Sequence, residues 1–295
     1  PQEIKDLSPG EHTVKIDGGE GWKVTDLELS NARWGVELKY DSVTERRYIW
    51  LQDLQINNMT NAFNSIPGAE KFNFLSAGIA IRHWTDDPGS PVFLRDLTIK
   101  NVSILNSNFG LWTGSICEGA PGRCNDDGFS VTGRWAYVDG FNLENITVTN
   151  GPQYGLSLAF MKNGSLTNTV VSNVGYQGWK HGPAGVAIVW TSDVTIDGLK
   201  IYNVSRENDS DGCGIDFEGG NLRTTYRNSE IVDTDGSGIC VYDNGGYAGP
   251  NKDLIIENVD ITRFGRAPYQ NPPLPNSHAI AFHLTDFNDG LHTGL

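Results

Sequence analysis

Apolar and polar residues alternate in short runs along almost the whole chain, and one ten-residue pattern recurs. The pattern is apolar-x-apolar-x-Asn written twice in succession, and its copies end at Asn31, Asn58, Asn106, Asn150, Asn173, Asn203, Asp233 and Arg263. Successive ends lie 23 to 48 residues apart, and the last three intervals are 30 residues each. Alternation with a period of two residues and many β-branched side chains predicts strands. No segment sustains a helical period, so the pattern predicts an all-β chain with almost no helix.

A second strand-like piece follows most copies of the pattern and begins with glycine, followed by apolar residues at alternate positions. Its copies begin at Gly35, Gly78, Gly128, Gly155, Gly185, Gly214 and Gly238, with Ala279 in that place at the last copy. Strands this short cannot each bury a face, so successive repeats must stack. A parallel β-helix does this, with one repeat per coil and coils about 4.8 Å apart. A sandwich or a propeller would need hairpin turns that this sequence largely lacks.

The asparagines that end each pattern have a structural interpretation. Asn tolerates left-handed corners, and stacked side-chain amides can hydrogen-bond along a column. Two segments, near residues 59–77 and 109–125, are too long for simple corners, and loops of this length on a rigid scaffold usually wall a binding cleft. We therefore predict a single domain over residues 1–295, a parallel β-helix of about eight or more coils with these two loop insertions.

The repeat resembles that of the pectate-lyase-like superfamily of right-handed parallel β-helices, in particular its carbohydrate-active members, over residues from about 22 to 284. NDDGFSV, beginning at Asn125, is similar to the Asn-x-Asp-Gly segment of polygalacturonase-type hydrolases. DGCGIDFEGG, beginning at Asp211, is similar to acidic strands of β-helix glycosidases. The Gly-His-Gly and Arg-x-Lys segments of polygalacturonases do not occur in this sequence. The resemblance implies a right-handed β-helix and a glycoside hydrolase-like protein outside the polygalacturonase family.

Composition and charge narrow the partners. The chain is 38% hydrophobic and 20% charged, and its 22 Lys and Arg against 36 Asp and Glu give a net charge of −14 and a pI near 4.7. This balance disfavours nucleic acid and anionic membranes, because clustered Lys and Arg hold both. It also disfavours a strongly acidic polysaccharide unless a cation or a basic patch offsets the repulsion. No stretch reaches the ~18 to 20 apolar residues that span a bilayer. We expect a monomer that binds carbohydrate and has no nucleic-acid or membrane partner.

Several features favour secretion. The chain begins at Pro1 without a basic-then-apolar leader, as a mature or trimmed chain would. Cys117 and Cys124 flank a short Gly/Pro loop, as a disulfide would, and the other two cysteines, Cys213 and Cys240, have no metal-type spacing. Glycosylation sequons begin at Asn58, Asn101, Asn145, Asn163, Asn203 and Asn208. An Asn- and Thr-rich repeat also generates such triplets by itself, so the sequons indicate an exported glycoprotein only weakly.

The candidate catalytic residues are three carboxylates. Alignment of the second strands on their glycines places Asp216 and Glu218 on the outward face of one strand, beside small neutral side chains of the neighbouring coils. At i and i+2 the two carboxylates should stand about 6.5 to 7 Å apart, a spacing that suits an inverting glycosidase. Asp243 follows on the next strand and is the third candidate. Repulsion within this set should raise one pKa and keep an acid protonated near neutral pH.

Six further residues are candidates for substrate binding. Rings beside a groove commonly stack on sugars, although they also pack in cores. Charged or polar groups on the same outward face could bind hydroxyl or carboxylate groups. The candidates are Arg82, Trp84, Asp127, Trp190, Tyr242 and His283.

A second acidic group lies at the corners that lead into these strands and includes Asp126, Asp127, Asp209, Asp211 and Asp235. Asp211 and Asp235 have equivalent offsets and should be neighbours in successive coils. Corner capping explains such residues, because Asp readily bonds its own turn backbone. Calcium is the alternative, because hard cations bind several carboxylate and carbonyl oxygens. The sequence has no EF-hand or RTX spacing, so we assign no metal or cofactor and leave calcium possible.

The favoured hypothesis is a secreted glycoside hydrolase that cleaves a neutral or weakly charged poly- or oligosaccharide, with Asp216 and Glu218 as acid/base or nucleophile and Asp243 assisting. Two alternatives stay open. One is a calcium-dependent polysaccharide lyase, which the scarcity of outward-facing bases disfavours. The other is a non-catalytic sugar-binding or adhesin β-helix.

Overall fold

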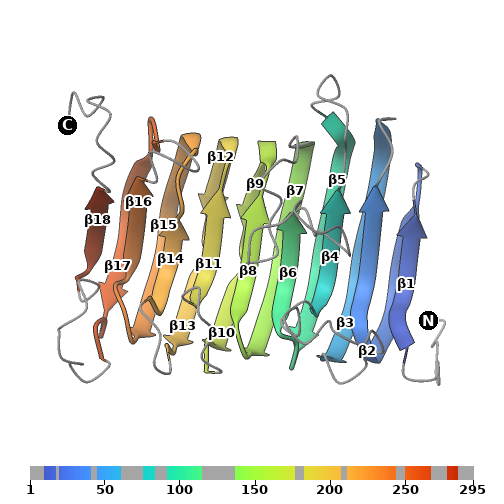
Figure 1. Cartoon of the computed structure of the whole chain (residues 1–295), viewed down its shortest axis with the longest axis horizontal. Helices are drawn as coiled ribbons and strands as arrows, with labels where there is room; N and C mark the ends of the chain where they lie inside the picture. The colour runs from blue at the N-terminus through green and yellow to red at the C-terminus, as the bar shows by residue number, and fades with distance from the viewer. Residues whose placement is uncertain are drawn as a thin grey trace, which may run out of the picture.

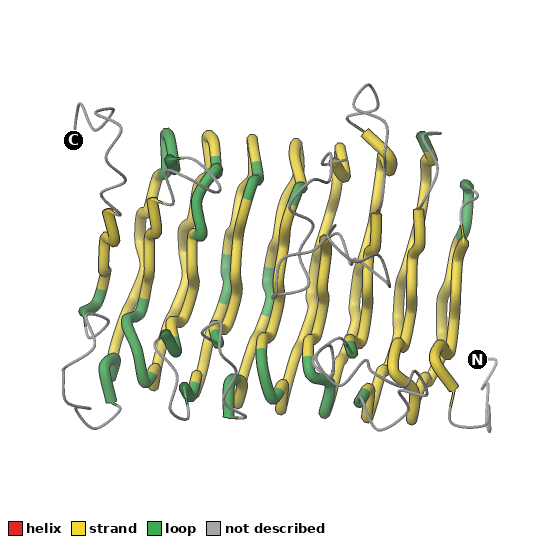
Figure 2. Tube along the Cα trace, viewed as in Figure 1, coloured by secondary structure: helices red, strands yellow, loops and turns green. Residues whose placement is uncertain are grey.

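The computed structural model describes residues 10–17, 20–40, 45–60, 76–83, 92–114, 137–176, 183–206, 211–243, 250–266 and 278–284. These residues form strands and turns and contain no helix (Figures 1 and 2). The strands are β1 (Gly10–Asp17), β2 (Lys23–Tyr40), β3 (Arg46–Met59), β4 (Ala77–His83), β5 (Val92–Leu105), β6 (Phe109–Gly114), β7 (Tyr137–Gly151), β8 (Tyr154–Ala159), β9 (Met161–Thr167), β10 (Val170–Val174), β11 (Ala184–Val189), β12 (Ser192–Asp197), β13 (Lys200–Val204), β14 (Cys213–Phe217), β15 (Leu222–Thr234), β16 (Ile239–Asp243), β17 (Ile255–Thr262) and β18 (Ile280–Leu284).

Every pair of neighbouring strands is parallel, and the pairing skips along the sequence as a coil requires. One face, which we call the first sheet, runs β1–β2–β4–β6–β8–β11–β14–β16–β18. A second face runs β2–β3–β5–β7–β10–β13–β15–β17, and a third passes from β7 through β9 and β12 to β15. The predicted all-β parallel β-helix is confirmed, and its coils lie side by side along the long axis of the molecule (Figure 1).

The apolar core fills the inside of the coils. On this interior side of the first sheet Leu38 pairs with Ile81, and Ile188 pairs with Leu158 and Phe217, and all five are almost fully buried. The recurrent glycine that begins these strands has a steric cause. A β-carbon at Gly214 would stand 2.5 Å from the Ile231 side chain and 2.6 Å from the Gly238 carbonyl oxygen. Contacts this close exclude any side chain, so the glycines that aligned the strands in the sequence mark places where two backbones meet.

The asparagine column is confirmed as a structural feature. Its described members have left-handed backbone angles, with φ between 54° and 59°. Each side-chain amide donates to the carbonyl oxygen of the corresponding residue one coil earlier, at distances of 2.8 to 3.4 Å, along Asn31, Asn58, Asn106, Asn150, Asn173 and Asn203. The column satisfies polar groups at the corners and holds neighbouring coils in register.

The sequons fall largely within such ladders. Of the six, Asn208 lies outside the described residues. In each of the other five, the Nδ2 atom that a glycan would occupy donates a hydrogen bond to a residue of a neighbouring coil. The repeat therefore explains these triplets without glycosylation.

The loop insertions differ in part from the prediction. Residues 61–75 and 115–136 lie outside the described part of the chain. Phe109–Gly114, which the sequence placed in the second insertion, form strand β6 and are buried. The FGLWTG segment has the same glycine-led alternation as the other strands, with Leu111 pairing with Ile79 and Leu156 inside the core. Within the described residues no helix is long and apolar enough to cross a membrane.

Candidate acidic site on the first sheet

One row of outward-facing residues crosses the first sheet and carries the candidate chemistry. We call it the outer row, and it consists of Glu37, Ala80, Trp112, Ser157, Ala187, Asp216, Cys240 and Ala281. Several of its members form an apolar cluster that is separate from the main core. Carboxylates occur at two places in this row, near its N-terminal end and at β14.

Asp216 lies in the outward-facing row, as the sequence predicted, but its side chain is not exposed there. It is only 1% exposed, and Ala187 and Cys240 lie beside it in the neighbouring strands. Its Oδ1 atom is buried and has no hydrogen-bond partner among the described residues. Burial raises the pKa of Asp216 well above its usual value, and the negative charges of Glu218 and Asp211 raise the pKa further. Of the two carboxyl groups, Asp216 is therefore the one whose protonated form its surroundings favour.

Glu218 is the partly exposed member of the pair. It follows the last residue of β14, and its backbone amide donates to the Ile188 carbonyl oxygen at 2.9 Å. A side-chain hydrogen bond joins Glu218 to Asp216. The two carboxyl groups are therefore in contact, and the expected separation of about 6.5 to 7 Å is wrong. The strand ends between these residues, so Glu218 does not keep the extended geometry on which that spacing rests.

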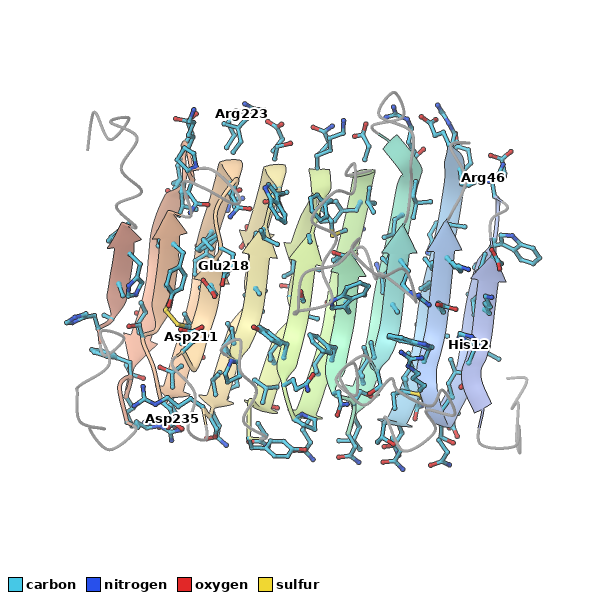
Figure 3. All side chains as sticks on the ribbon, in the orientation of Figure 1. His12, Arg46, Asp211, Glu218, Arg223 and Asp235 are labelled. Atoms are coloured by element: carbon cyan, nitrogen blue, oxygen red, sulfur yellow. A yellow bond between two sulfur atoms is a disulfide. The ribbon has the colours of Figure 1, made fainter. Side chains whose placement is uncertain are left out.

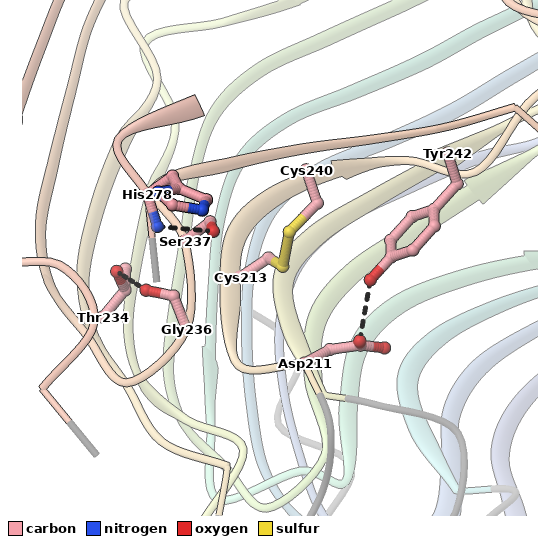
Figure 4. Close-up of a disulfide and its surroundings, with 8 residues drawn as sticks. All are labelled: Asp211, Cys213, Thr234, Gly236, Ser237, Cys240, Tyr242 and His278. Carbon is pink, nitrogen blue, oxygen red and sulfur yellow. Dashed lines mark hydrogen bonds between the residues drawn. A yellow bond between two sulfur atoms is a disulfide. The ribbon is translucent and has the colours of Figure 1, made fainter. Parts of the chain in front are cut away.

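Asp211, which precedes β14, and Tyr242, on β16, are the next two members of the site. Asp211 lies two residues before β14, and its Oδ1 accepts a hydrogen bond from the Tyr242 hydroxyl at 2.9 Å (Figure 4). Tyr242, on β16, stacks on His283 of β18 with ring centroids 4.4 Å apart. Partial burial, with a smaller effect from His278, lowers the pKa of His283. Tyr242 and His283, both predicted to bind substrate, thus lie together beside the acidic pair, and Asp211 is an additional member.

The disulfide of the described chain lies in the same place. Cys213 and Cys240 are bonded, with their Cα atoms 6.2 Å apart, and they link β14 to β16 (Figure 4). The bridge expected from the sequence, between Cys117 and Cys124, lies outside the described residues. The positions of these cysteines in the repeat could have predicted the bond. Cys240 lies next to Asp216 in the outer row, and Cys213 directly precedes Gly214, which begins the strand that contains Asp216.

Arg82 belongs to a different cluster and is not an exposed binding group. It is 7% exposed, forms an ion pair with Glu37 and stands over the Trp34 ring. His12 contacts the other Glu37 oxygen at 2.9 Å. Burial alone would raise the pKa of Glu37, but the contact with His12 and the charges of Arg82 and His12 outweigh burial and lower the pKa to about 2. Figure 3 shows His12 at the opposite end of the molecule from Glu218 and Asp211.

Of the remaining predicted residues, one packs against a neighbouring ring, and the side chains of the others lie outside the described residues. Trp190 stacks on Phe160, with centroids 4.7 Å apart, and is half-buried, which is the packing role that the sequence left open. Asp243 ends β16, where its backbone pairs with Leu284, but its side chain lies outside the described residues. Trp84 and Asp127 also lie outside them.

Corner capping, the first interpretation of the acidic corners, describes Asp235. Its carboxylate accepts from the Arg206 backbone amide at 3.2 Å. Asp126, Asp127 and Asp209 fall outside the described chain. Among the described residues, no group of three or more His, Cys, Asp or Glu side chains has the geometry to hold a metal ion.

Comparison with known proteins returned two solved structures of interest. No family model and no curated protein sequence matches the chain. The enzymatically active domain of tailspike protein 2 from bacteriophage CBA120 is similar at 14% identity with a TM-score of 0.41, over 93% of this chain. This chain spans only 42% of the tailspike chain. The A-module of the mannuronan C-5 epimerase AlgE4 from Azotobacter vinelandii is similar at 14% identity with a TM-score of 0.17, over 88% of this chain and 90% of that one.

Proposed function

We propose that this protein is a secreted glycoside hydrolase that acts on a neutral or weakly charged poly- or oligosaccharide, with the Asp216–Glu218 pair supplying the acid. The observation that carries the proposal is a buried carboxyl group, Asp216, in hydrogen-bond contact with a partly exposed one, Glu218, with no cation among the groups that shift its pKa. Such a pair retains a proton at a pH where ordinary carboxyl groups have lost theirs.

The two carboxyl groups divide the work by exposure. Asp216 is too buried to reach a sugar, so Glu218 contacts the substrate and protonates the glycosidic oxygen while the bond to the anomeric carbon breaks. Asp216 orients Glu218 and holds the shared proton at rest, and it passes this proton to Glu218 through their hydrogen bond as Glu218 protonates the glycosidic oxygen. The pair then takes up a proton from solvent before the next cycle. Water then adds to the anomeric carbon and gives its proton to a carboxylate.

The carboxylate that takes this proton from water must be a third residue, separate from Asp216 and Glu218. The acid and its partner stand about 5 to 5.5 Å apart in retaining glycosidases and about 6.5 to 9.5 Å apart in inverting ones, because a sugar must fit between them. Asp216 and Glu218 touch, so they act as one acid unit. Asp243, at the end of the neighbouring strand β16, is our candidate for the base or nucleophile.

Tyr242 and His283 offer an aromatic surface next to this unit. Their rings are stacked and partly exposed, and aromatic rings bind the apolar faces of sugars. We assign them to substrate binding.

The test is release of reducing ends from a panel of neutral polysaccharides by the wild type and by Asp216→Asn/Glu218→Gln. We expect release by the wild type and a loss of at least about a hundredfold in the double variant, because general acid catalysis contributes that much. Asp253→Asn/Glu257→Gln, which removes two exposed carboxylates on another face, is the matched control and should keep full activity. Undiminished activity in the folded double variant would refute the assignment, and an unsaturated product that absorbs in the ultraviolet would indicate a lyase.

A further inference from the structure

Asp211 and Asp235 occupy equivalent corners of successive coils, yet their side chains have different partners. Their backbones stack, because the Gly236 amide donates to the Gly212 carbonyl oxygen at 3.0 Å. Asp235 caps the Arg206 amide at 3.2 Å and stands 3.3 Å from the Arg266 guanidinium. Asp211 contacts Tyr242 instead. Figure 3 shows Asp211 beside Glu218 on the first sheet and Asp235 at the edge of the molecule.

Covalent and hydrogen bonds fix Asp211 in this position. Asp211 is two residues before Cys213, and Tyr242 is two residues after Cys240. The Cys213–Cys240 disulfide and the Tyr242–Asp211 hydrogen bond therefore close one ring that joins β14 to β16 (Figure 4). Asp211 is 8% exposed, and Tyr242 is held by its stacking on His283. The Asp211 carboxylate thus has little freedom to turn away from Asp216.

We propose that Asp211 is a positioning residue: its carboxylate, held by Tyr242 and the disulfide, keeps the shared proton on the Asp216–Glu218 pair at neutral pH. The inference deepens the proposed function, because it names the device that maintains the acid of that site. A fixed negative charge near a second carboxyl group disfavours ionisation of that group. The Tyr242 hydroxyl donates to Asp211 Oδ1, and a hydrogen bond of this kind favours the charged form of a carboxyl group.

The surroundings of Asp216 support this division. The causes of its raised pKa are, in order, burial, the charge of Glu218, the charge of Asp211 and the hydrogen bond with Glu218. On one side, β11 contributes Ala187 and no titratable side chain. On the other, the described side chains of β16 contribute only Cys240, which is in the disulfide, and Tyr242. Arg206 packs beside Gly212 but is not among the groups that act on Asp216, and His283 touches Tyr242.

The decisive experiment follows the ¹³C resonance of the Asp216 carboxyl group, assigned through Asp216→Asn, as the pH is varied. Asp211→Asn should lower the titration midpoint of Asp216 by about one pH unit or more, as expected for the loss of one charge at close range in a protein interior. Asp235→Asn is the matched control, because it removes a carboxylate from the equivalent corner of the next coil. It should leave the midpoint in place. An equal midpoint in wild type and Asp211→Asn would overturn the inference.

Tyr242→Phe keeps the test decisive if Asp211→Asn does not fold. Without the hydroxyl, Asp211 loses its donor and its tether, so its charge acts more weakly on Asp216 and the midpoint should again fall, by less than in Asp211→Asn. An unchanged midpoint in Tyr242→Phe would also overturn the inference. Because the titration needs no substrate, a shifted midpoint in a protein without hydrolase activity supports the inference while refuting the proposed function. An active hydrolase whose Asp216 midpoint does not shift supports the proposed function and refutes the inference about Asp211.

Discussion

Two buried carboxylates occupy the same row of the first sheet, and they differ in almost every other respect. Glu37, on β2, and Asp216, on β14, are linked by the register through Ala80, Trp112, Ser157 and Ala187. Glu37 is 0% exposed and Asp216 is 1% exposed. The pKa of Glu37 is lowered to about 2, whereas that of Asp216 is raised well above its usual value.

The difference lies in the neighbours. Two residues after Glu37 is Lys39, and the adjacent position of the next coil is Arg82. Two residues after Asp216 is Glu218, and Tyr242 lies two residues after Cys240, the partner of Asp216 in the next coil. The cations Arg82 and His12 thus act on Glu37, whereas the negative charges of Glu218 and Asp211 act on Asp216. The scaffold supplies the same buried position twice, and the charge of the neighbours decides whether the pKa of the carboxyl group is lowered or raised.

The comparison also separates structure from function. A buried carboxylate that is paired with cations is a structural ion pair, and no functional role is needed to account for its burial. A buried carboxylate whose surroundings raise its pKa is costly to keep, and such groups gather at functional sites. For this reason Arg82, a substrate-binding candidate in the sequence, is better explained by its contact with Glu37.

The largest effect should come from breaking the ion pair. Arg82→Met leaves the Glu37 charge buried without its main cation and should lower the free energy of unfolding at pH 7 by about 3 to 5 kcal/mol, measured by urea denaturation. Glu37→Gln/Arg82→Met removes both charges and should recover most of the loss. The penalty of the single variant should shrink as the pH falls toward 2, because Glu37 without Arg82 takes up a proton at a higher pH than it does in the wild type, where its pKa is about 2. A loss well under 1 kcal/mol would show that the pair is not structural.

A smaller effect of opposite sign is expected at Asp216. Its folded-state pKa lies above the unfolded value of 3.8, so the unfolded chain releases this proton first as the pH rises. Stability associated with Asp216 is therefore complete below that pH and declines until the folded-state pKa is passed. Asp216→Asn should remove this decline. The difference in free energy of unfolding between Asp216→Asn and the wild type should therefore favour the variant by roughly 1 to 2 kcal/mol more at pH 8 than at pH 4, measured by urea denaturation at both pH values. A parallel pH dependence of the two proteins would contradict the raised pKa.

The smallest effect should come from making the second cluster resemble the first. Tyr242→Arg places a guanidinium where Arg82 stands beside Glu37, so the pKa of Asp216 should fall. We expect Tyr242→Arg to be about 1 kcal/mol more stable at pH 8 than Tyr242→Phe, which loses the same hydroxyl without adding a charge. Hydrolase activity should be lost, because the acid is then ionised. Equal stabilities would mean that the arginine does not reach Asp216.

Much of this fold could be predicted because the repeat is local and regular. The alternation from Gly214 to Phe217 fixes which side chains face the core, and the asparagines at the pattern ends form the expected column. The strand Phe109–Gly114 was missed because its place among the coils depends on the segments around it. At the site, Asp216 and Glu218 were found from alternation, but their burial and contact were not.

The sequence by itself determined that the chain is a stack of short parallel strands with an acidic pair on the outer face of one of them. Alternation within a strand has a fixed period, so it can be read from consecutive residues. Only the tertiary structure decided that Arg82 meets Glu37, that Tyr242 meets Asp211 and that Cys213 bonds Cys240. These contacts cross between coils, and coils of unequal length bring together residues whose separation in the sequence follows no fixed period. Burial likewise depends on all surrounding groups at once, and burial is the main cause of the raised pKa of Asp216.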